Sequence, residues 1–182
     1  MTKLKPCQHC QNLFAPVRPL QAVCSPRCAM AKVRQDKQAE RAKDKLRKRD
    51  AMRLRDILAK AQEAFNAFIR ARDADKPCIC CGKPFEPQKP GGSMDAGHYL
   101  ARSIAPQHRF NEDNVFGQRK NCNRPGGTTR AAFRAGVIER IGIERVEALE
   151  ADNRVPKWTR EQLFALIETY RAKTRELKKE NA

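Results

Sequence analysis

Eight cysteines fall into two groups along the 182-residue chain, and their spacing is the strongest chemical signal in the sequence. The first group consists of Cys7-x2-Cys10 and Cys24-x3-Cys28. Two closely spaced cysteine pairs of this kind are typical of a structural zinc site with four thiolate ligands. In a reducing compartment such pairs hold metal more often than they form disulfides. The sequence therefore predicts a four-cysteine zinc finger over residues 1–30.

The second group of cysteines is less complete. Cys78, Cys81 and Cys122 are candidate ligands of a second zinc ion, and Cys80 is an additional candidate because it lies between the first two. A zinc ion held here would fix two loops against each other in a small domain.

Four polar residues accompany this second group in the order Asp95, His98, Asn114 and Asn123. A nuclease needs a base for water and a cation that stabilises the phosphate and the leaving oxygen. His98 is the candidate base because imidazole titrates near neutral pH, and Asp95 and Asn123 are candidate Mg²⁺ ligands because that ion prefers oxygen. Asn114 is expected to brace the loop that presents His98. Any one of these residues alone is more often an ordinary surface, core or turn residue, so the prediction depends on the combination.

The charge of the chain indicates what such a site would face. Lys and Arg number 38 against 21 Asp and Glu, which gives a formal net charge of +17. This excess favours a polyphosphate partner, although a merely soluble basic protein or one that binds acidic membrane surfaces has the same signature. No apolar run approaches the ~18 residues of a membrane-spanning helix, and the first residues lack the apolar stretch of a signal peptide. We therefore expect a cytoplasmic protein.

The remaining sequence predicts a mostly helical α+β protein around these groups. Residues 31–73 lack Gly and Pro and are expected to form one long basic helix, either a solvated spacer or an arm along DNA phosphates. Residues 74–151 carry the chemistry on short strands and turns, followed by helix. Residues 152–182 are expected to form a C-terminal helix with a basic tail, opened by the capping box Thr159-x2-Gln162.

Apolar residues at helical spacing predict which helix faces are buried. One stripe near the end of the basic helix consists of Leu54, Leu58, Ala61, Phe65 and Phe68. A second stripe, on the last helix, consists of Leu163, Ile167 and Tyr170. The helical segment 129–151 is expected to break near Gly142, because glycine disfavours a helix interior.

Six segments spread over most of the chain carry a resemblance to a known family. They are Phe65–Asp73, Pro77–Gly82, Asp95–Tyr99, Arg109–Val115, Cys122–Arg124 and Ile138–Gly142, and the N-terminal cysteines and Trp158-Thr159 also fit. The chain resembles the NinG (Rap) family of lambdoid phage recombination proteins, which are described as branch-specific DNA endonucleases. The central domain of that family is similar to the His-Me finger (HNH) fold of resolvases of the phage endonuclease VII type.

The resemblance implies a small ββα-metal nuclease domain over residues 74–151. By this resemblance, Asp95 and Asn123 are expected to bind the catalytic Mg²⁺, and His98 is expected to act as the general base. It also implies branched double-stranded DNA as the partner and the bacterial host cytoplasm as the location. Resolving a junction takes two cuts, which is compatible with a homodimer, but no heptad run in the sequence indicates one.

Three positions depart from the pattern of that family. Phe116 and Pro125 stand where the pattern has histidines, and Arg119 stands where it has the fourth zinc cysteine. Arginine cannot bind Zn²⁺ because its guanidinium stays protonated. We therefore expect the second zinc site to bind more weakly than the first, with three thiolates and water or with Cys80 recruited.

Two functions follow from these observations. The first is a metal-dependent, structure-specific DNA endonuclease for Holliday junctions and D-loops, which the four polar residues favour. The second is a catalytically degenerate zinc-finger protein that binds branched DNA without cutting it, which the three departures favour. Of the two functions, the sequence favours the endonuclease. An RNA-binding or ribosomal-type zinc protein explains the charge and the cysteines but not the order of the four polar residues.

Overall fold

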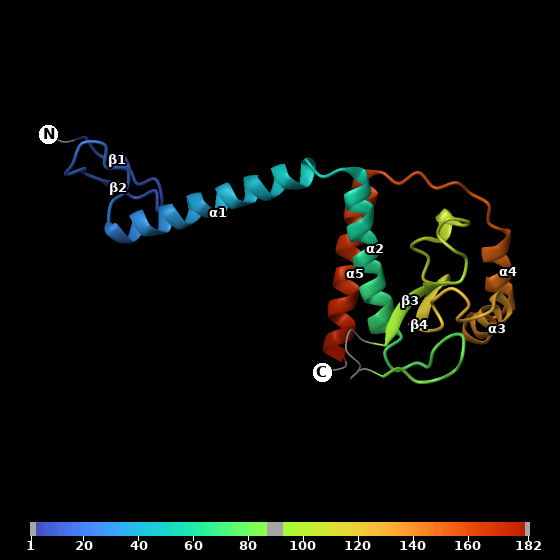
Figure 1. Ribbon diagram of the computed structural model, residues 1–182. Coiled ribbons are helices and arrows are strands. Elements are labelled where there is room, and N and C mark those ends of the chain that lie inside the picture. The colour runs from blue at the N-terminus through green and yellow to red at the C-terminus, as the bar shows by residue number, and fades with distance from the viewer. Residues whose placement is uncertain (1–2, 87–92, 181–182) are drawn as a thin grey trace. The chain divides into compact units, whose positions relative to one another are not determined.

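The structure is a computed structural model in which residues 3–86 and 93–180 are described, and it divides into two units, residues 1–52 and 53–182 (Figure 1). The described residues are mostly helical and contain two small antiparallel sheets of two strands each. No helix among them is both long enough and apolar enough to cross a membrane.

The first unit consists of a minimal hairpin and one long helix. Strand β1 (Lys5–Pro6) pairs with β2 (Leu13–Phe14), and helix α1 (Pro26–Asp50) follows. Ser25 caps α1 because its hydroxyl accepts a hydrogen bond from the Cys28 N–H at 3.2 Å. No side chain of α1 is buried. This helix therefore depends on its own propensity and its cap rather than on packing.

The single helix expected over residues 31–73 is wrong, because the structure has two helices. Helix α1 ends at Asp50, and α2 (Leu54–Arg72) begins after Arg53, whose backbone is extended at φ −72° and ψ 150°. The boundary between the two units lies at the same place. Arg49 and Arg53 would be neighbours at i, i+4 spacing in a continuous helix, and like charges there are destabilising. With nothing buried on α1, no packing opposes the break.

Helices α2 and α5 (Arg160–Glu180) lie side by side in the second unit (Figure 1). Phe65 of α2 makes edge-to-face contact with Tyr170 of α5, with ring centroids 4.7 Å apart. The predicted face of α5 is buried, as are Ala61, Phe65 and Phe68 of α2. Leu54 is 47% exposed, however, so the apolar stripe of α2 begins only at Ile57.

The sheet of the second unit pairs β3 (Met94–His98) with β4 (Val115–Arg119) in antiparallel register. A loop with a short 3-10 turn, η1 (Pro106–His108), connects the strands. Helices α3 (Arg130–Ile141) and α4 (Ile143–Ala151) follow and are separated by Gly142 at φ +87°, as the sequence predicts. One cluster joins the sheet to these helices, formed by Ile79, Tyr99, Phe116, Phe133, Val137 and Val146.

A buried carboxylate ties the end of α2 to β4. Asp73 is 1% exposed and accepts hydrogen bonds from the Gly117 N–H and from Arg72, both at 2.8 Å. Arg72 in turn donates to the backbone carbonyls of Glu112 and Val115. Burial alone would raise the pKa of Asp73, but Arg72 and the Gly117 N–H hold it below its usual value.

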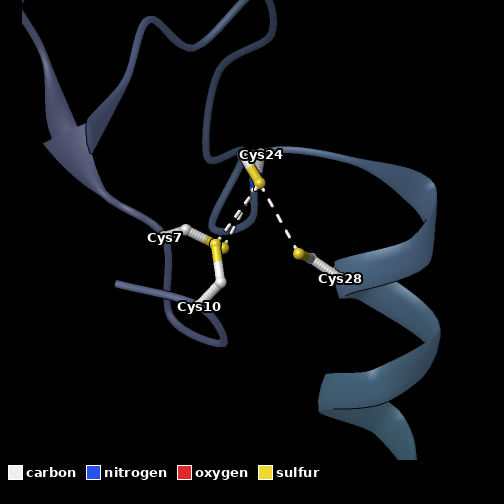
Figure 2. A group of neighbouring side chains, drawn as sticks. All are labelled: Cys7, Cys10, Cys24 and Cys28. Atoms are coloured by element: carbon white, nitrogen blue, oxygen red, sulfur yellow. Dashed lines mark hydrogen bonds between the residues drawn. The ribbon is translucent and has the colours of Figure 1, made fainter. Parts of the chain in front are cut away.

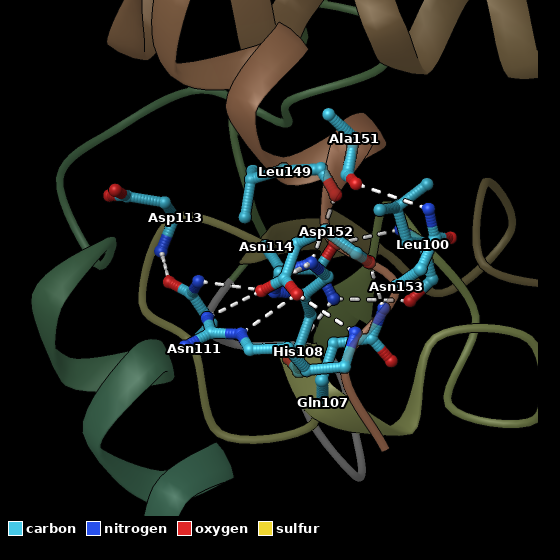
Figure 3. Close-up of polar contacts among 11 residues, drawn as sticks. Leu100, Gln107, His108, Asn111, Asp113, Asn114, Leu149, Ala151, Asp152 and Asn153 are labelled. Atoms are coloured by element: carbon cyan, nitrogen blue, oxygen red, sulfur yellow. Dashed lines mark hydrogen bonds and ion pairs between the residues drawn. The ribbon is translucent and has the colours of Figure 1, made fainter. Parts of the chain in front are cut away.

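A second buried polar group, centred on His108, fastens α4 to the loop between the strands (Figure 3). The His108 ring is 3% exposed, and its Nε2 lies 2.9 Å from the Leu149 carbonyl oxygen. Its Nδ1 lies 3.3 Å from the side-chain nitrogen of Asn111. Because both ring nitrogens have hydrogen-bond partners within the protein, His108 has a structural role.

Candidate nuclease and metal sites

The cysteines of the first unit converge on one point (Figure 2). All four sulfur atoms of Cys7, Cys10, Cys24 and Cys28 lie within 4.8 Å of one another. The Sγ atoms of Cys10 and Cys24 are 3.7 Å apart, and those of Cys24 and Cys28 are 3.5 Å apart. Tetrahedral zinc with Zn–S bonds of ~2.3 Å places its sulfurs ~3.8 Å apart, so this thiolate set fits a zinc ion.

The β1–β2 hairpin and the cap of α1 bring these sulfurs together. Cys7 directly follows β1, and Cys10 lies in the turn before β2. Cys24 precedes the cap residue, and Cys28 lies in the first turn of α1. The Cys24 N–H also donates to the Cys7 sulfur at 3.4 Å. Such donors favour the thiolate form that binds metal.

The second cysteine group holds three sulfurs. Those of Cys78, Cys81 and Cys122 lie within 4.8 Å of one another, and no fourth Cys, His, Asp or Glu joins them in the described part of the chain. The Cys80 thiol lies outside this set, where its sulfur accepts a hydrogen bond from Gln118 Nε2 at 3.1 Å and packs beside the apolar cluster. A hydrogen bond from Cys80, opposed by burial and aided by the Arg119 N–H, lowers the pKa of Cys78 to about 4.

Arg119 stands beside this site without its guanidinium entering it. Its backbone N–H donates to the Cys78 sulfur at 3.2 Å. Its side chain turns away to pair with Glu86 and to bond the Pro84 carbonyl at 3.4 Å. The three thiolates therefore fit a zinc ion that takes its fourth ligand from solvent.

Asp95 and Asn123 are in direct contact. Asp95 lies on β3 opposite Gln118, and Asn123 lies in the turn after β4, where its N–H bonds the Arg119 carbonyl. The Asn123 side-chain nitrogen donates to Asp95 Oδ2 at 3.2 Å. Asn123 is exposed and Asp95 is half-buried. A carboxylate beside an amide, both open to solvent, is a donor set that fits Mg²⁺ with several retained waters.

His98 is a neutral, oriented imidazole. Its Nε2 lies 3.0 Å from the Arg109 carbonyl oxygen, which makes Nε2 the protonated nitrogen and Nδ1 the one with a lone pair. Burial and, to a smaller extent, the charges of Arg102 and Arg109 lower the pKa of His98 to about 4, against the opposing effect of the Arg109 carbonyl. At neutral pH the ring is therefore unprotonated at Nδ1 and is a weak base.

The four predicted residues form two groups rather than one. Successive side chains of a strand point to opposite faces, so Asp95 and His98, three positions apart on β3, leave opposite faces of the sheet. Asp95 shares its face with Gln118, whereas His98 shares its face with Val115. The structure thus brings Asp95 to Asn123 and brings His98 to Arg109.

Asn114 is a positioning residue. Its side chain is 0% exposed, and its Oδ1 accepts from the Leu100 N–H at 2.8 Å. Its Nδ2 donates to the carbonyls of Leu100 and His108, both at 3.1 Å. Since every polar atom of this amide is engaged by backbone, Asn114 braces the loop between the strands and does not face substrate.

Sequence reasoning missed three residues on the His98 face: Gln62, Arg102 and Arg109. Arg109 orients His98 through a backbone carbonyl, which no side-chain pattern reveals. Gln62 is 6% exposed in the apolar stripe of α2, and a polar residue at a buried helical position was the available signal.

Comparison with known proteins identifies relatives over nearly the full chain. The family model described as Bacteriophage Lambda NinG protein matches residues 1–180. Protein ninG of Salmonella phage P22 is 36% identical over 190 residues, covering 94% of this chain and 91% of the relative. Protein ninG of Escherichia phage lambda is 36% identical over 188 residues, covering 93% and 90%. No solved structure matches.

Proposed function

The chain belongs to the NinG family of bacteriophage proteins, and from that premise we propose that it is a metal-dependent, structure-specific DNA endonuclease. Its substrates are branched recombination intermediates, such as Holliday junctions and D-loops, in the cytoplasm of the bacterial host. The observation that carries the proposal is the Asp95–Asn123 contact, a solvent-open oxygen donor pair in a chain with a net charge of +17.

Asp95 and Asn123 would hold Mg²⁺ through a carboxylate oxygen and the amide oxygen. When bound, the ion supplies charge stabilisation to the phosphate and the leaving oxygen. The two residues come from β3 and from the turn after β4, and Cys122 of the three-thiolate site lies in that same turn. A zinc ion there would therefore keep Asn123 against Asp95 and would support catalysis without entering it.

His98 would act as the general base through Nδ1. Its pKa of about 4 makes it a weak base in the free protein, because the ring is largely buried and because Arg102 and Arg109 add positive charge beside it. A bound phosphate brings negative charge to the same place and so raises the pKa toward the range in which a base is efficient. The arrangement thus favours proton transfer in the DNA complex over the free protein.

The first unit supports a DNA-binding role. Twelve Lys and Arg residues occur between Lys32 and Lys60, most of them on α1, which buries no side chain. An exposed basic helix of this kind can lie along phosphates, and the four-thiolate site would anchor its N-terminal end. A homodimer would supply the two cuts that a four-way junction requires.

One observation favours the second candidate function, a protein that binds branched DNA without cutting. His98 and the Asp95–Asn123 pair leave opposite faces of β3, whereas hydrolysis needs the base and the metal at one phosphodiester. The second cysteine group also favours this function, because it has three thiolates and an arginine at position 119 in place of a fourth cysteine.

The deciding experiment incubates the purified protein with a labelled four-way junction and with a matched linear duplex, in Mg²⁺ and in EDTA. The endonuclease proposal expects Mg²⁺-dependent cuts in the junction only. His98→Ala should lose ~10²–10⁴-fold in rate while keeping junction affinity, and Asp95→Ala and Asn123→Ala should show the same split. His9→Ala, which removes an exposed histidine of the other unit, is the matched control and should cut at the parental rate.

Cleavage by a well-folded His98→Ala protein at the parental rate would reject the role of His98. A parent that binds the junction tightly and never cuts it would select the second candidate function.

A further inference from the structure

Two arginines of the loop between β3 and β4 converge on one buried amide of α2. Arg109 Nε donates to Gln62 Oε1 at 2.9 Å, and Arg102 Nη1 lies 3.5 Å from the same oxygen. Gln62 is 6% exposed, and its own nitrogen is held by Asn66 Oδ1 at 2.8 Å. The Arg109 guanidinium also lies over the Phe110 ring. The two cations are therefore fixed side by side on a neutral acceptor.

The pairing of these two arginines differs from that of at least half of the arginines in the second unit, which have a carboxylate partner. Among the described residues of this unit, at least eight arginines form ion pairs with a carboxylate. They are Arg53 and Arg55 with Asp56, Arg72 and Arg140 with Asp73, Arg119 with Glu86, Arg134 with Glu150, Arg145 with Asp113 and Arg154 with Asp152. In the described part of the chain neither Arg102 nor Arg109 has such a partner, and the residues outside that part include neither Asp nor Glu.

The electrostatics of the pair are unfavourable without an added anion. Burial and the neighbouring charge of Arg102 lower the pKa of Arg109, and both charges lower the pKa of His98. Like charges this close repel unless a counter-charge is present. Arg102 is exposed and Arg109 is half-buried, so an anion can reach both.

We propose that Arg102, Arg109 and Gln62 form a binding site for a DNA phosphodiester on the His98 face of β3. This inference rests on the proposed function in taking DNA as the partner, but it requires no cleavage. Each guanidinium has five N–H donors and gives one to Gln62, which leaves a planar fork on each residue for phosphate oxygens. Gln62 positions the two forks, and a phosphate held between them would lie next to His98.

The test measures affinity for a four-way junction in EDTA by fluorescence anisotropy over a range of salt concentrations. Arg102 is the first target because it is exposed and its loss should leave folding intact. Arg102→Gln should weaken binding and should flatten the log–log salt slope by about 0.9, the effect of one lost phosphate contact. Arg102→Lys keeps the charge but not the fork, so its slope should stay parental while its affinity falls.

Lys157→Gln is the matched control, because it removes the same charge from an exposed loop. Its slope should remain parental. Equal slopes and affinities for Arg102→Gln and the parent would overturn the proposal. An equal flattening in Lys157→Gln would overturn it as well, since only the overall charge would then matter.

A second readout follows the ring of His98 by NMR, which is practical with three histidines in the chain. Adding the junction should raise the His98 pKa in the parent, and this rise should be smaller in Arg102→Gln. An unchanged His98 pKa on saturation with DNA would contradict a phosphate at this place. A parent that shows these effects and never cuts rejects the endonuclease function and leaves this site standing. If the parent cuts the junction and Arg102→Gln binds it normally, the endonuclease function stands and the phosphate site is rejected.

Discussion

Replacing Asn114 by alanine tests whether one buried amide holds the loop between β3 and β4. The side chain makes three hydrogen bonds, one from the Leu100 N–H and one each to the carbonyls of Leu100 and His108. All three partners are backbone groups, and the side chain is 0% exposed. The substitution therefore leaves one backbone donor and two backbone acceptors without their side-chain partner at a buried position.

The expected loss in the free energy of unfolding follows from the number of hydrogen bonds that the substitution removes. A net contribution of ~1 kcal/mol for each bond gives ~3 kcal/mol, and the cost of unsatisfied buried groups can only add to it. We expect Asn114→Ala to lower the free energy of unfolding of the second unit by ~3 kcal/mol. With a urea slope of ~2 kcal/mol per molar, the unfolding midpoint should fall by ~1.5 M.

Tryptophan fluorescence during urea unfolding is a direct assay. The single Trp158 lies in the second unit, and its ring contacts Phe110 of the same loop at a centroid distance of 5.1 Å. Asn153→Ala is the matched control, because that exposed amide makes one bond, to the Ala151 carbonyl, and should shift stability by less than ~0.5 kcal/mol. A midpoint for Asn114→Ala within ~0.3 M of the parent would refute the bracing role.

Three further predictions concern metal, acid and salt. Arg119→Cys should raise the zinc content toward two ions per chain and raise the melting temperature, measured by metal analysis and calorimetry; two tightly held zinc ions in the parent would contradict this. His98 has a pKa of about 4 in the folded protein and ~6.5 when unfolded. The contribution of the neutral ring to the free energy of unfolding is therefore complete above pH 6.5 and is lost as pH falls toward 4. That gap in pKa corresponds to ~3 kcal/mol in full, of which ~2.5 kcal/mol is lost between pH 7 and pH 4.5. The acid destabilisation of His98→Gln, compared by urea unfolding at these two pH values, should be smaller than that of the parent by ~2.5 kcal/mol. Removing residues 1–52 should flatten the salt dependence of DNA binding, and an unchanged slope would make α1 a spacer only.

Features that depend on local chemistry were predictable from the sequence. Thr159 and Gln162 form the reciprocal bonds of the expected capping box, at 3.2 and 2.9 Å, and the helix expected over residues 129–151 is interrupted at Gly142. Both depend on residues within a few positions of each other. The mostly helical α+β composition is likewise confirmed.

Features that depend on distant partners were not predictable. The break between α1 and α2 follows from packing that α2 has and α1 lacks, and no Gly or Pro marks it. The link from Asp73 to Gly117 spans 44 residues and ends on a backbone N–H. The separation of His98 from Asp95 requires knowing that both lie on one regular strand, whereas the order of residues suggested a single cluster.

The absence of buried side chains on α1 has a consequence for how this protein can change over generations. Substitutions at exposed positions away from caps and ion-pair networks shift folding stability by little. Lysines and arginines on α1 can therefore be gained or lost with small effect on the core of the second unit, which folds around its own residues. Helix α1 can therefore diverge in charge at a smaller cost to folding than the core residues of the second unit can change.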